Sequence, residues 1–198
     1  MTAVEMQHSF QSKMQGGNDH PFFFETYRIE KLLNEAQNIY VDKYAPTIDI
    51  DEESRKRLNI LIKNASLDVD ASGSDNLPNG QFVSLPVGVR RVLTEYVTTA
   101  SGTTKVMPIK YDNYLADREN PFKKPYSDLV WRVDYGPGLR HELITDGSLT
   151  PTGYKMRYLA NPRYVSIMDE IDCQLPTKDH EEIVNIALSL VNTISEKE

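Results

Sequence analysis

The acidic segment that begins at Asp68 has the clearest chemical pattern in the sequence. Asp68, Asp70 and Ser72 place oxygen-bearing side chains at alternate positions, and Gly73 follows them. This is the first half of a calcium-binding loop, which needs oxygen ligands at positions 1, 3 and 5 and a glycine at its sharp turn. Position 12, where such loops have a bidentate glutamate, is Asn79. The pattern therefore favours an acidic surface loop, and weak cation binding by Asp68 and Asp70 stays open.

A thiol and an imidazole form the second candidate pair. Cys173 is the single cysteine, and His180 follows it closely in the sequence. Such a pair is nucleophilic when the imidazole lies within hydrogen-bond reach of the thiol. A lone cysteine beside apolar residues is more often a small buried side chain. The start of a helix, where His180 is expected, disfavours a charged imidazole. The sequence therefore favours structural roles for both residues.

The rest of the sequence lacks the spacing of a catalytic, metal or cofactor site. The four histidines do not have metal-ligand spacing. Neither a glycine-rich phosphate loop nor a GxSxG nucleophile motif occurs. We therefore expect no cofactor and predict a structural or binding protein, not an enzyme. A metal-dependent or cysteine-based accessory enzyme, built on Asp68 and Asp70 or on Cys173 and His180, is the alternative.

The composition excludes several classes of protein. The chain has 198 residues, and its 22 Lys and Arg against 29 Asp and Glu give a net charge of −7. A protein that holds nucleic acid through bulk charge needs the opposite balance. One cysteine excludes an intramolecular disulfide and a cysteine-rich zinc site. No apolar run suggests a membrane span or a signal peptide, so we expect a soluble chain in a reducing cytoplasm.

The first helical periodicity lies in the N-terminal third of the chain. From Phe24 to Tyr40, apolar residues recur at the spacing of one helix face, and the opposite face carries polar residues, among them Glu30 and Gln37. A second helix follows after Asp49 or Asp51, either of which is a suitable N-cap. This helix directs Arg55, Lys56 and Arg57 toward solvent. The two helices predict a helical hairpin.

The C-terminal segment is also helical. Thr177 is a suitable N-cap, and apolar residues then form a continuous stripe over 183–194.

Between the helical ends, residues 64–81 predict a long polar loop, and residues 88–110 predict a β-hairpin around Ser101-Gly102. Strand patterns over 129–134, 140–145 and 154–159 predict an antiparallel meander. This order predicts an α+β fold in which the N-terminal helical hairpin and the long C-terminal helix pack with an antiparallel sheet.

The first 20 residues differ from the rest of the chain. They are polar, contain Gly16-Gly17 and show no periodicity. We expect residues 1–20 to be a flexible N-terminal arm, as chain termini often are, followed by one α+β domain over 21–198. Such an arm is able to order against a neighbouring subunit.

Aromatic and arginine residues beside prolines or strand starts are the candidate interface residues. Aromatics and arginine are enriched among the anchors of protein interfaces. The candidates are Phe22, Phe23 and Phe24 after His20-Pro21, the doublet Arg90 and Arg91, and Phe122 and Tyr126 in the proline-bounded loop 120–126.

Several short motifs occur in a particular order along the chain. They are LLNEAQNIY (32–40), QFVSLP (81–86), YDxY (111–114), NPFKKP (120–125), YLANPxYV (158–165) and CQLPxxxHEEIV (173–184). In this order they resemble a virion structural protein of crAss-like bacteriophages, a ring or adaptor protein of the head–tail neck region. The resemblance extends over roughly residues 24–195 and does not distinguish one ring from another.

The resemblance implies assembly in place of catalysis. Proteins of this kind form closed rings, often twelvefold, around the DNA exit channel below the portal. It therefore implies a homo-oligomer in the virion, assembled in the host cytoplasm, that contacts the portal and other neck or tail rings. Genomic DNA passes through such a ring without specific binding, and an acidic subunit suits that passage because it does not hold DNA. A binding module unrelated to phages is a further alternative.

Overall fold

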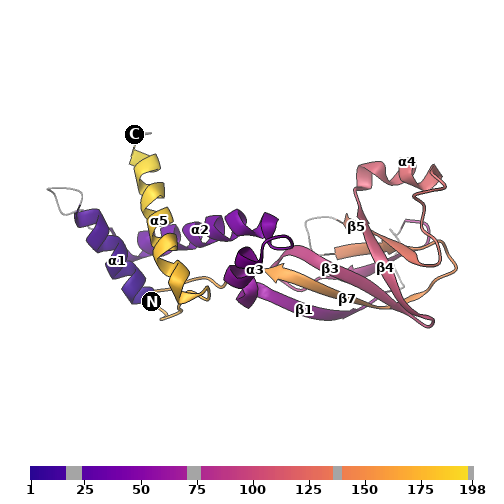
Figure 1. Ribbon diagram of the computed structural model, residues 1–198, viewed down its shortest axis with the longest axis horizontal. Helices are drawn as coiled ribbons and strands as arrows, with labels where there is room; N and C mark the ends of the chain where they lie inside the picture. Colours follow the sequence, from indigo (N-terminus) through magenta and orange to yellow (C-terminus); the bar gives the residue numbers. More distant parts are fainter. Residues whose placement is uncertain (17–23, 71–76, 136–139, 196–198) are drawn as a thin grey trace. The chain divides into compact units, whose positions relative to one another are not determined.

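The computed structural model describes residues 1–16, 24–70, 77–135 and 140–195 (Figure 1). The chain forms two compact units, a helical unit from residues 1–62 and 161–198 and a sheet unit from residues 63–160. The α+β class predicted from the sequence is confirmed. The sequence predicts one domain after an arm, whereas the structure draws its helical unit from both ends of the chain.

The helical unit is built around α2. Figure 1 shows α1 and α5 packed against this helix. In α5, Ile183 and Ala187 of the predicted apolar stripe are fully buried, as is Val184 beside them. The helices are α1 (Ala3–Gln15), α2 (Thr26–Tyr44), α3 (Glu52–Leu58) and α5 (His180–Ser195), with 3-10 turns η1 (Ala45–Thr47), η2 (Asn59–Leu61) and η4 (Thr177–Asp179).

Helix α1 occupies the segment for which the sequence predicts a flexible arm. A capping box starts it: the Thr2 hydroxyl accepts the Glu5 amide hydrogen, and the Glu5 carboxylate accepts that of Thr2. Ala3, Met6 and Phe10 are fully buried. Their spacing puts them on one helix face. The prediction of a flexible arm is therefore wrong for residues 3–15, because the polar composition of the segment hides this short apolar face. Residues 17–20 lie outside the described residues.

The structure shows which residue caps α3, and it corrects the N-cap predicted for the C-terminal helix. Asp51, not Asp49, caps α3, because its carboxylate accepts the backbone hydrogen of Ser54 at 2.8 Å. Thr177 is not the N-cap of the C-terminal helix. It lies inside η4, and α5 begins only at His180.

Arg57 is a junction between three helical segments, although the sequence pattern directs it to solvent. Its Nη1 atom lies 2.5 Å from Oδ1 of Asp179 in η4 and 3.1 Å from the hydroxyl of Tyr40 in α2. Its guanidinium also stacks over the Tyr44 ring, 5.0 Å from the centroid. Asp179 is buried, so this ion pair fixes α3 and the start of α5 to α2.

The sheet unit is a curled sheet with the strand order β1-β7-β3-β4-β5-β6-β2. Strand β3 pairs antiparallel with both β4 and β7, and β6 pairs antiparallel with both β5 and β2. Strands β4 and β5 pair in parallel. The strands are β1 (Ile62–Asp68), β2 (Gly80–Ser84), β3 (Val89–Thr99), β4 (Gly102–Ile109), β5 (Leu129–Tyr135), β6 (Arg140–Ile144) and β7 (Pro151–Ala160).

The sheet order corrects two predictions and confirms one. The β3–β4 hairpin is confirmed, and Gly102 at its turn has a φ of 137° that favours glycine. The three-strand meander is wrong, because β7 pairs with β3 and not with β6. The polar loop predicted over 64–81 contains most of β1, where Ala65 and Leu67 alternate with polar residues and pack on the core, as does Val69 just after the strand.

Two hydrophobic clusters stabilise the sheet unit. One lies among β2, β3, β5, β6 and β7 and includes Val97, Leu143 and Tyr154. The other joins the sheet to α4 (Tyr114–Glu119), which follows the 3-10 turn η3 (Tyr111–Asn113). In this second cluster the Tyr114 ring packs edge-on against buried Trp131, with 6.2 Å between centroids.

The Arg57 junction predicts a large effect of one substitution. Arg57→Ala leaves the buried Asp179 carboxylate without its cation, and losing one partner of a buried pair lowers the free energy of unfolding by about 3 kcal/mol. Urea denaturation followed by circular dichroism of the helices measures this. The matched control is Lys56→Ala, which removes an exposed i,i+4 pair with Glu52 and is expected to change stability by under about 0.5 kcal/mol. Equal stability of the two variants would contradict the assignment.

Candidate functional site

The acidic segment lies in the sheet unit, at the end of β1. Asp68 is exposed, and the backbone of Asp70 forms a bridge with Phe82 through hydrogen bonds of 2.8 and 3.1 Å. Residues 71–76, which include Ser72 and Gly73, lie outside the described residues. Over the ranges that the structure describes, His, Cys, Asp and Glu side chains form no group of three or more suited to a metal ion.

Cys173 and His180 are both buried, and each bonds to a different partner. The Cys173 thiol donates to Oε1 of Gln37 at 3.0 Å, whereas Nε2 of His180 donates to the carbonyl oxygen of Leu175 at 2.7 Å. Burial raises the pKa of the Cys173 thiol to about 11. The thiol therefore keeps its proton near neutral pH and has the structural role that the sequence favours.

A ladder of buried polar side chains on α2 holds a distant segment of chain. Asn34 pairs with the backbone of Val165 in both directions, each hydrogen bond 2.8 Å long. One turn away, Oε1 of Glu30 accepts the amide hydrogens of Ile167 and Met168 at 2.6 and 3.1 Å. At the other end, Gln37 donates to the carbonyl oxygen of residue 163 at 2.9 Å. The ladder replaces the β-partner that this extended segment lacks.

The held segment continues into a tight loop over residues 164–171. Ser166 and Ile171 close this 164–171 loop through two backbone hydrogen bonds of 3.1 and 2.8 Å. Glu170 has a φ of 53°, which is uncommon outside glycine. Met168, near the tip, is 79% exposed, and Tyr164 is exposed at its base. The loop thus presents two large apolar side chains on a fixed backbone.

Neither Glu30 nor Gln37 is recognisable as part of this ladder from the sequence, because both belong to the polar face of the predicted helix. The structure leaves Glu30 and Gln37 buried, at 6% and 1% exposure. Glu30 and Gln37 lie four and three residues from Asn34, on one helix face, but this spacing is equally that of an exposed polar face and so does not reveal the partner.

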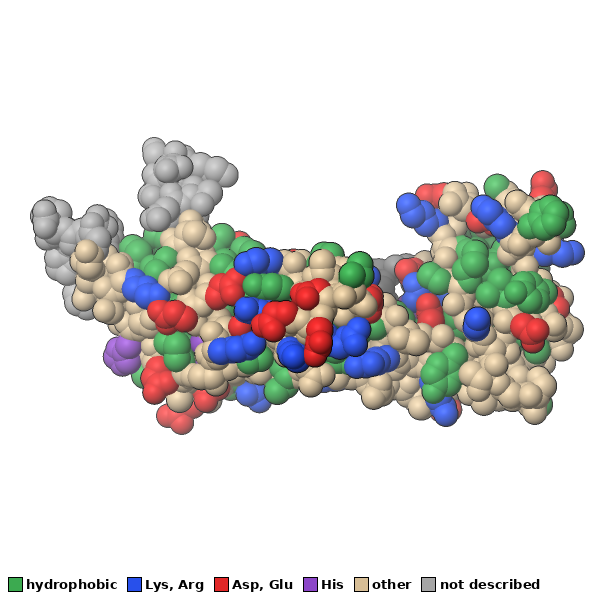
Figure 2. Space-filling model, in the orientation of Figure 1, with side chains coloured by type: hydrophobic (Ala, Val, Ile, Leu, Met, Phe, Trp, Pro, Cys, Tyr) green, Lys and Arg blue, Asp and Glu red, His purple; other side chains and the backbone are tan. Residues whose placement is uncertain are grey.

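The second exposed apolar feature is the α4 patch, formed by Tyr111, Leu115, Phe122 and Tyr126. Phe122 is 95% exposed and Leu115 is 71% exposed. Figure 2 shows hydrophobic side chains gathered around α4 and the following loop, with Lys and Arg side chains among them. The loop over residues 120–126 is anchored to the sheet, since the indole N–H of Trp131 donates to the carbonyl oxygen of Lys123 at 3.0 Å. Buried Trp131 therefore fixes the backbone of the loop that carries the exposed Phe122 and Tyr126.

A recess of about 450 Å³ adjoins the α4 patch. Tyr114, Trp131 and Ile144 of the second hydrophobic cluster line it, together with Tyr126 of the patch. Arg118 also lines the recess. Asn79, Lys124, Thr145 and Asp146 make the rest of the lining polar. An exposed aromatic patch beside a recess of mixed lining has the form of a protein-binding surface.

A second recess of the sheet unit, of about 420 Å³, is lined by three arginines together with Asp134 and His141. Behind it, Arg132 pairs with Glu95 at 3.1 Å, and Tyr154 donates to Glu95 at 2.5 Å. Burial and the Glu95 carboxylate raise the pKa of Tyr154, which keeps its hydroxyl a donor. We name this the arginine recess, and its lining includes Leu85, Val89, Val92, Arg90, Arg91 and Arg132.

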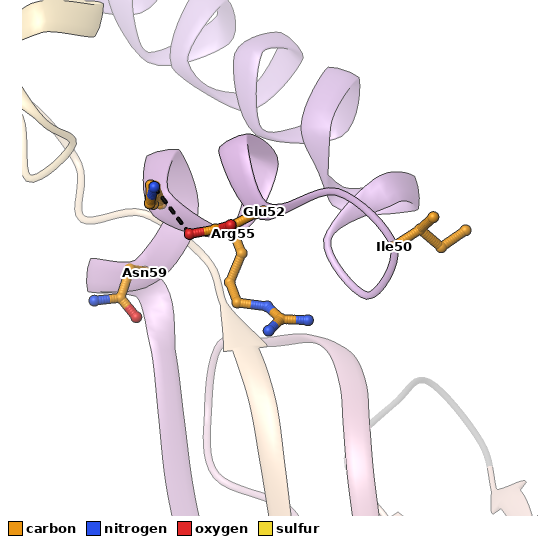
Figure 3. Close-up of a pocket in the computed structure, with 5 residues that line it drawn as sticks. Ile50, Glu52, Arg55 and Asn59 are labelled. Carbon is orange, nitrogen blue, oxygen red and sulfur yellow. Dashed lines mark ion pairs between the residues drawn. The ribbon is translucent and has the colours of Figure 1, made fainter.

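A third recess, of about 510 Å³, lies at α3 in the helical unit (Figure 3). Ile50 points outward from the loop before the helix, while Glu52 pairs with Lys56 at 2.9 Å. Arg55 donates to the carbonyl oxygens of residues 48 and 49, each at 3.4 Å. Because these charged side chains bond to their own helix and loop, the recess does not assemble a reactive group.

The interface residues predicted from the sequence have different surroundings. Phe22 and Phe23 lie outside the described residues, and Phe24 packs edge-on against Phe10 of α1, with 5.8 Å between centroids. Arg90 and Arg91 line the arginine recess, and Phe122 and Tyr126 belong to the α4 patch. The structure places both of these pairs at surfaces of the sheet unit but does not test their contact with a partner.

The environment of Cys173 predicts slow thiol chemistry. With a pKa of about 11, the thiolate fraction at pH 8 is about 100-fold smaller than for a thiol with a pKa near 9. Alkylation of the folded chain should therefore be slower by at least this factor and should accelerate as the pH approaches 11. The same chain unfolded in urea, as the control, should react at the ordinary rate. Rapid alkylation of the folded chain at pH 8 would contradict the burial.

Comparison with known proteins gives the family of the chain. In the part that the structure describes, no helix combines the length and hydrophobicity needed to cross a membrane. The family model described as "Phage tail ring protein 3/4" matches residues 20–198. The chain is also 26% identical to "Ring protein 4/5" of Bacteroides phage crAss001 over 184 residues, which cover 87% of this chain and 74% of that protein. The chain therefore belongs to the phage tail ring protein 3/4 family, a family of structural ring components of the virion.

Proposed function

We propose that this chain is the repeating subunit of a closed ring in the neck or tail of a crAss-like phage, below the portal. The family match over residues 20–198 is the observation that carries the proposal. The similar protein from phage crAss001 is itself named a ring protein. Twelve copies per ring is the number we propose, since it is the symmetry common among rings beneath a portal.

A closed ring places a geometric demand on its subunit. Each copy uses two different surfaces, because a ring forms through head-to-tail contacts in which one face complements another. The chain has distinct surfaces on its two units. The α4 patch with its adjoining recess lies on the sheet unit, and the 164–171 loop lies on the helical unit. The arginine recess adds a charged surface to the sheet unit.

The ring continues the DNA channel between the portal and the tail, in contact with other ring proteins. A net charge of −7 supports this role, because a subunit of the same sign as DNA does not hold it. The proposed role is structural. The Cys173 thiol and the His180 imidazole each hydrogen-bond to a different group and not to each other. These bonds support a non-catalytic function.

Assembly of the purified chain tests the proposal. Light scattering and electron microscopy should show closed rings, either from the chain alone at high concentration or after co-expression with the portal. A chain that stays monomeric under both conditions would overturn the proposal. The symmetry counted in the images tests the number of copies separately.

The α4 patch yields a prediction about assembly. Phe122→Asp should leave folding unchanged, because this side chain is 95% exposed, and should weaken assembly by about tenfold. Analytical ultracentrifugation measures the association. The control is Thr103→Asp, which adds the same charge at an exposed position of β4 outside the patch. If both variants assemble like the wild type, the α4 patch is not part of a ring contact.

A further inference from the structure

A closed cluster of polar side chains joins four strands of the sheet unit. Nδ1 of His141 on β6 lies 3.1 Å from the Tyr154 hydroxyl on β7, and this hydroxyl donates to Oε2 of Glu95 on β3 at 2.5 Å. Glu95 pairs with Arg132 on β5, which also lies 3.4 Å from Asp134. Nε2 of His141 completes the cluster at 3.2 Å from Oδ1 of Asp134. The cluster therefore connects β6 to β7, which lie on either side of β3, β4 and β5 in the sheet order.

The neighbours of the two ring nitrogens determine the protonation state of His141. The Tyr154 hydroxyl gives its one hydrogen to Glu95, so it can only accept from His141, and Nδ1 must carry a hydrogen. Asp134 is an ionised carboxylate, because the hydrogen bond with His141 and the charge of Arg132 lower its pKa. An ionised carboxylate also only accepts, so Nε2 must carry a hydrogen as well. An imidazole with hydrogens on both nitrogens is a cation.

The charges of the cluster agree with this assignment. Glu95 and Asp134 supply two negative charges, and Arg132 supplies one positive charge. A neutral His141 would leave one negative charge without compensation, whereas a cationic His141 brings the sum to zero. His141 is only 4% exposed and Tyr154 is fully buried, so water does not replace a missing partner between them.

The other charged side chains near His141 supply no further acceptor to its ring. Its neighbours in β6, Arg140 and Glu142, point to the opposite face, as the alternation of a strand requires. There the first stacks over an aromatic ring of β2 and the second accepts a backbone hydrogen bond from the segment before β2. The β2 residue opposite His141 is a valine. Arg90 and Arg91 of β3 line the same recess, but an arginine only donates.

We propose that His141 is an imidazolium in the folded chain and that its second proton joins β6 to β7 and so closes the curled sheet. Loss of this proton removes the donor either to the Tyr154 hydroxyl or to the Asp134 carboxylate, and one of the two contacts breaks. Because Arg132, Asp134 and His141 also line the arginine recess, the same loss makes this surface one charge more negative. The sheet unit is thus a structure sensitive to alkaline pH, independently of whether the chain forms a ring.

Nuclear magnetic resonance of the ring nitrogens tests the protonation state on the full chain. At about pH 7.5, both nitrogens of His141 should carry hydrogen, with the protonated form in excess by about tenfold or more. The exposed His8 is the internal reference, because a histidine in water is mostly neutral at this pH. The His141 signal is assigned by its loss in His141→Gln. A neutral imidazole at His141 would overturn the proposal.

A substitution at Asp134 tests what holds the proton. Asp134→Asn replaces the carboxylate by an uncharged amide at a side chain that is 66% exposed, so folding should be preserved. The ratio of protonated to neutral His141 should fall by about tenfold. The matched control is Asp112→Asn, which makes the same change at an exposed position of η3 outside the cluster and should leave the ratio unchanged. Equal ratios in the two variants would show that the cluster does not hold the proton.

The pH dependence of stability tests the structural consequence. An unfolded chain releases this proton near the ordinary histidine pKa of about 6.5, whereas the folded chain keeps it, so stability should decline between about pH 6.5 and 8.5. The urea midpoint of the wild type should decrease over this range more steeply than that of His141→Gln, or of Asp134→Asn if the first variant does not fold. Equal slopes would contradict a role of the proton in closing the sheet. Absence of ring assembly would overturn the proposed function and leave these measurements unchanged.

Discussion

The helical unit depends on the polar ladder of α2, in which Glu30, Asn34 and Gln37 hydrogen-bond to a segment more than 120 residues later. A helix face of ordinary apolar residues would leave the backbone groups of this segment buried without partners, which destabilises a fold. The ladder satisfies them and so joins the two ends of the chain. The side-chain oxygen of Gln37 also accepts a hydrogen bond from the Cys173 thiol, so the single cysteine belongs to the same network.

The ladder also determines what the helical unit presents outward. It fixes the backbone that leads into the 164–171 loop, where Met168 and Tyr164 are exposed on a closed turn. On the sheet unit, Trp131 has the corresponding role, because it supports α4 from one side and holds the carbonyl of Lys123. In both units a buried polar contact positions an exposed apolar surface, as a subunit built for assembly requires.

The sequence predicts those parts of the fold that have a strong local period. The apolar stripes of α2 and α5 and the turn at Gly102 are visible without tertiary information. The sequence does not predict helix α1, because its apolar residues are few, or strand β1, because Ala65 is small and Leu67 is isolated in a polar segment. The roles of Glu30 and Arg57 were out of reach for a different reason. Their partners are distant in sequence, and only the folded chain brings a buried carboxylate or backbone segment beside them. The sequence selects Phe122 by its residue type and its proline-bounded loop, and Arg91 as part of a basic doublet, but only the structure shows the exposure of Phe122 and the recess beside Arg91.

A cryo-electron microscopy reconstruction of the assembled chain tests the central claim most directly. The account predicts a closed ring of identical subunits, in which one face of each copy contacts a different face of the next. Particles without ring symmetry would contradict the proposed function.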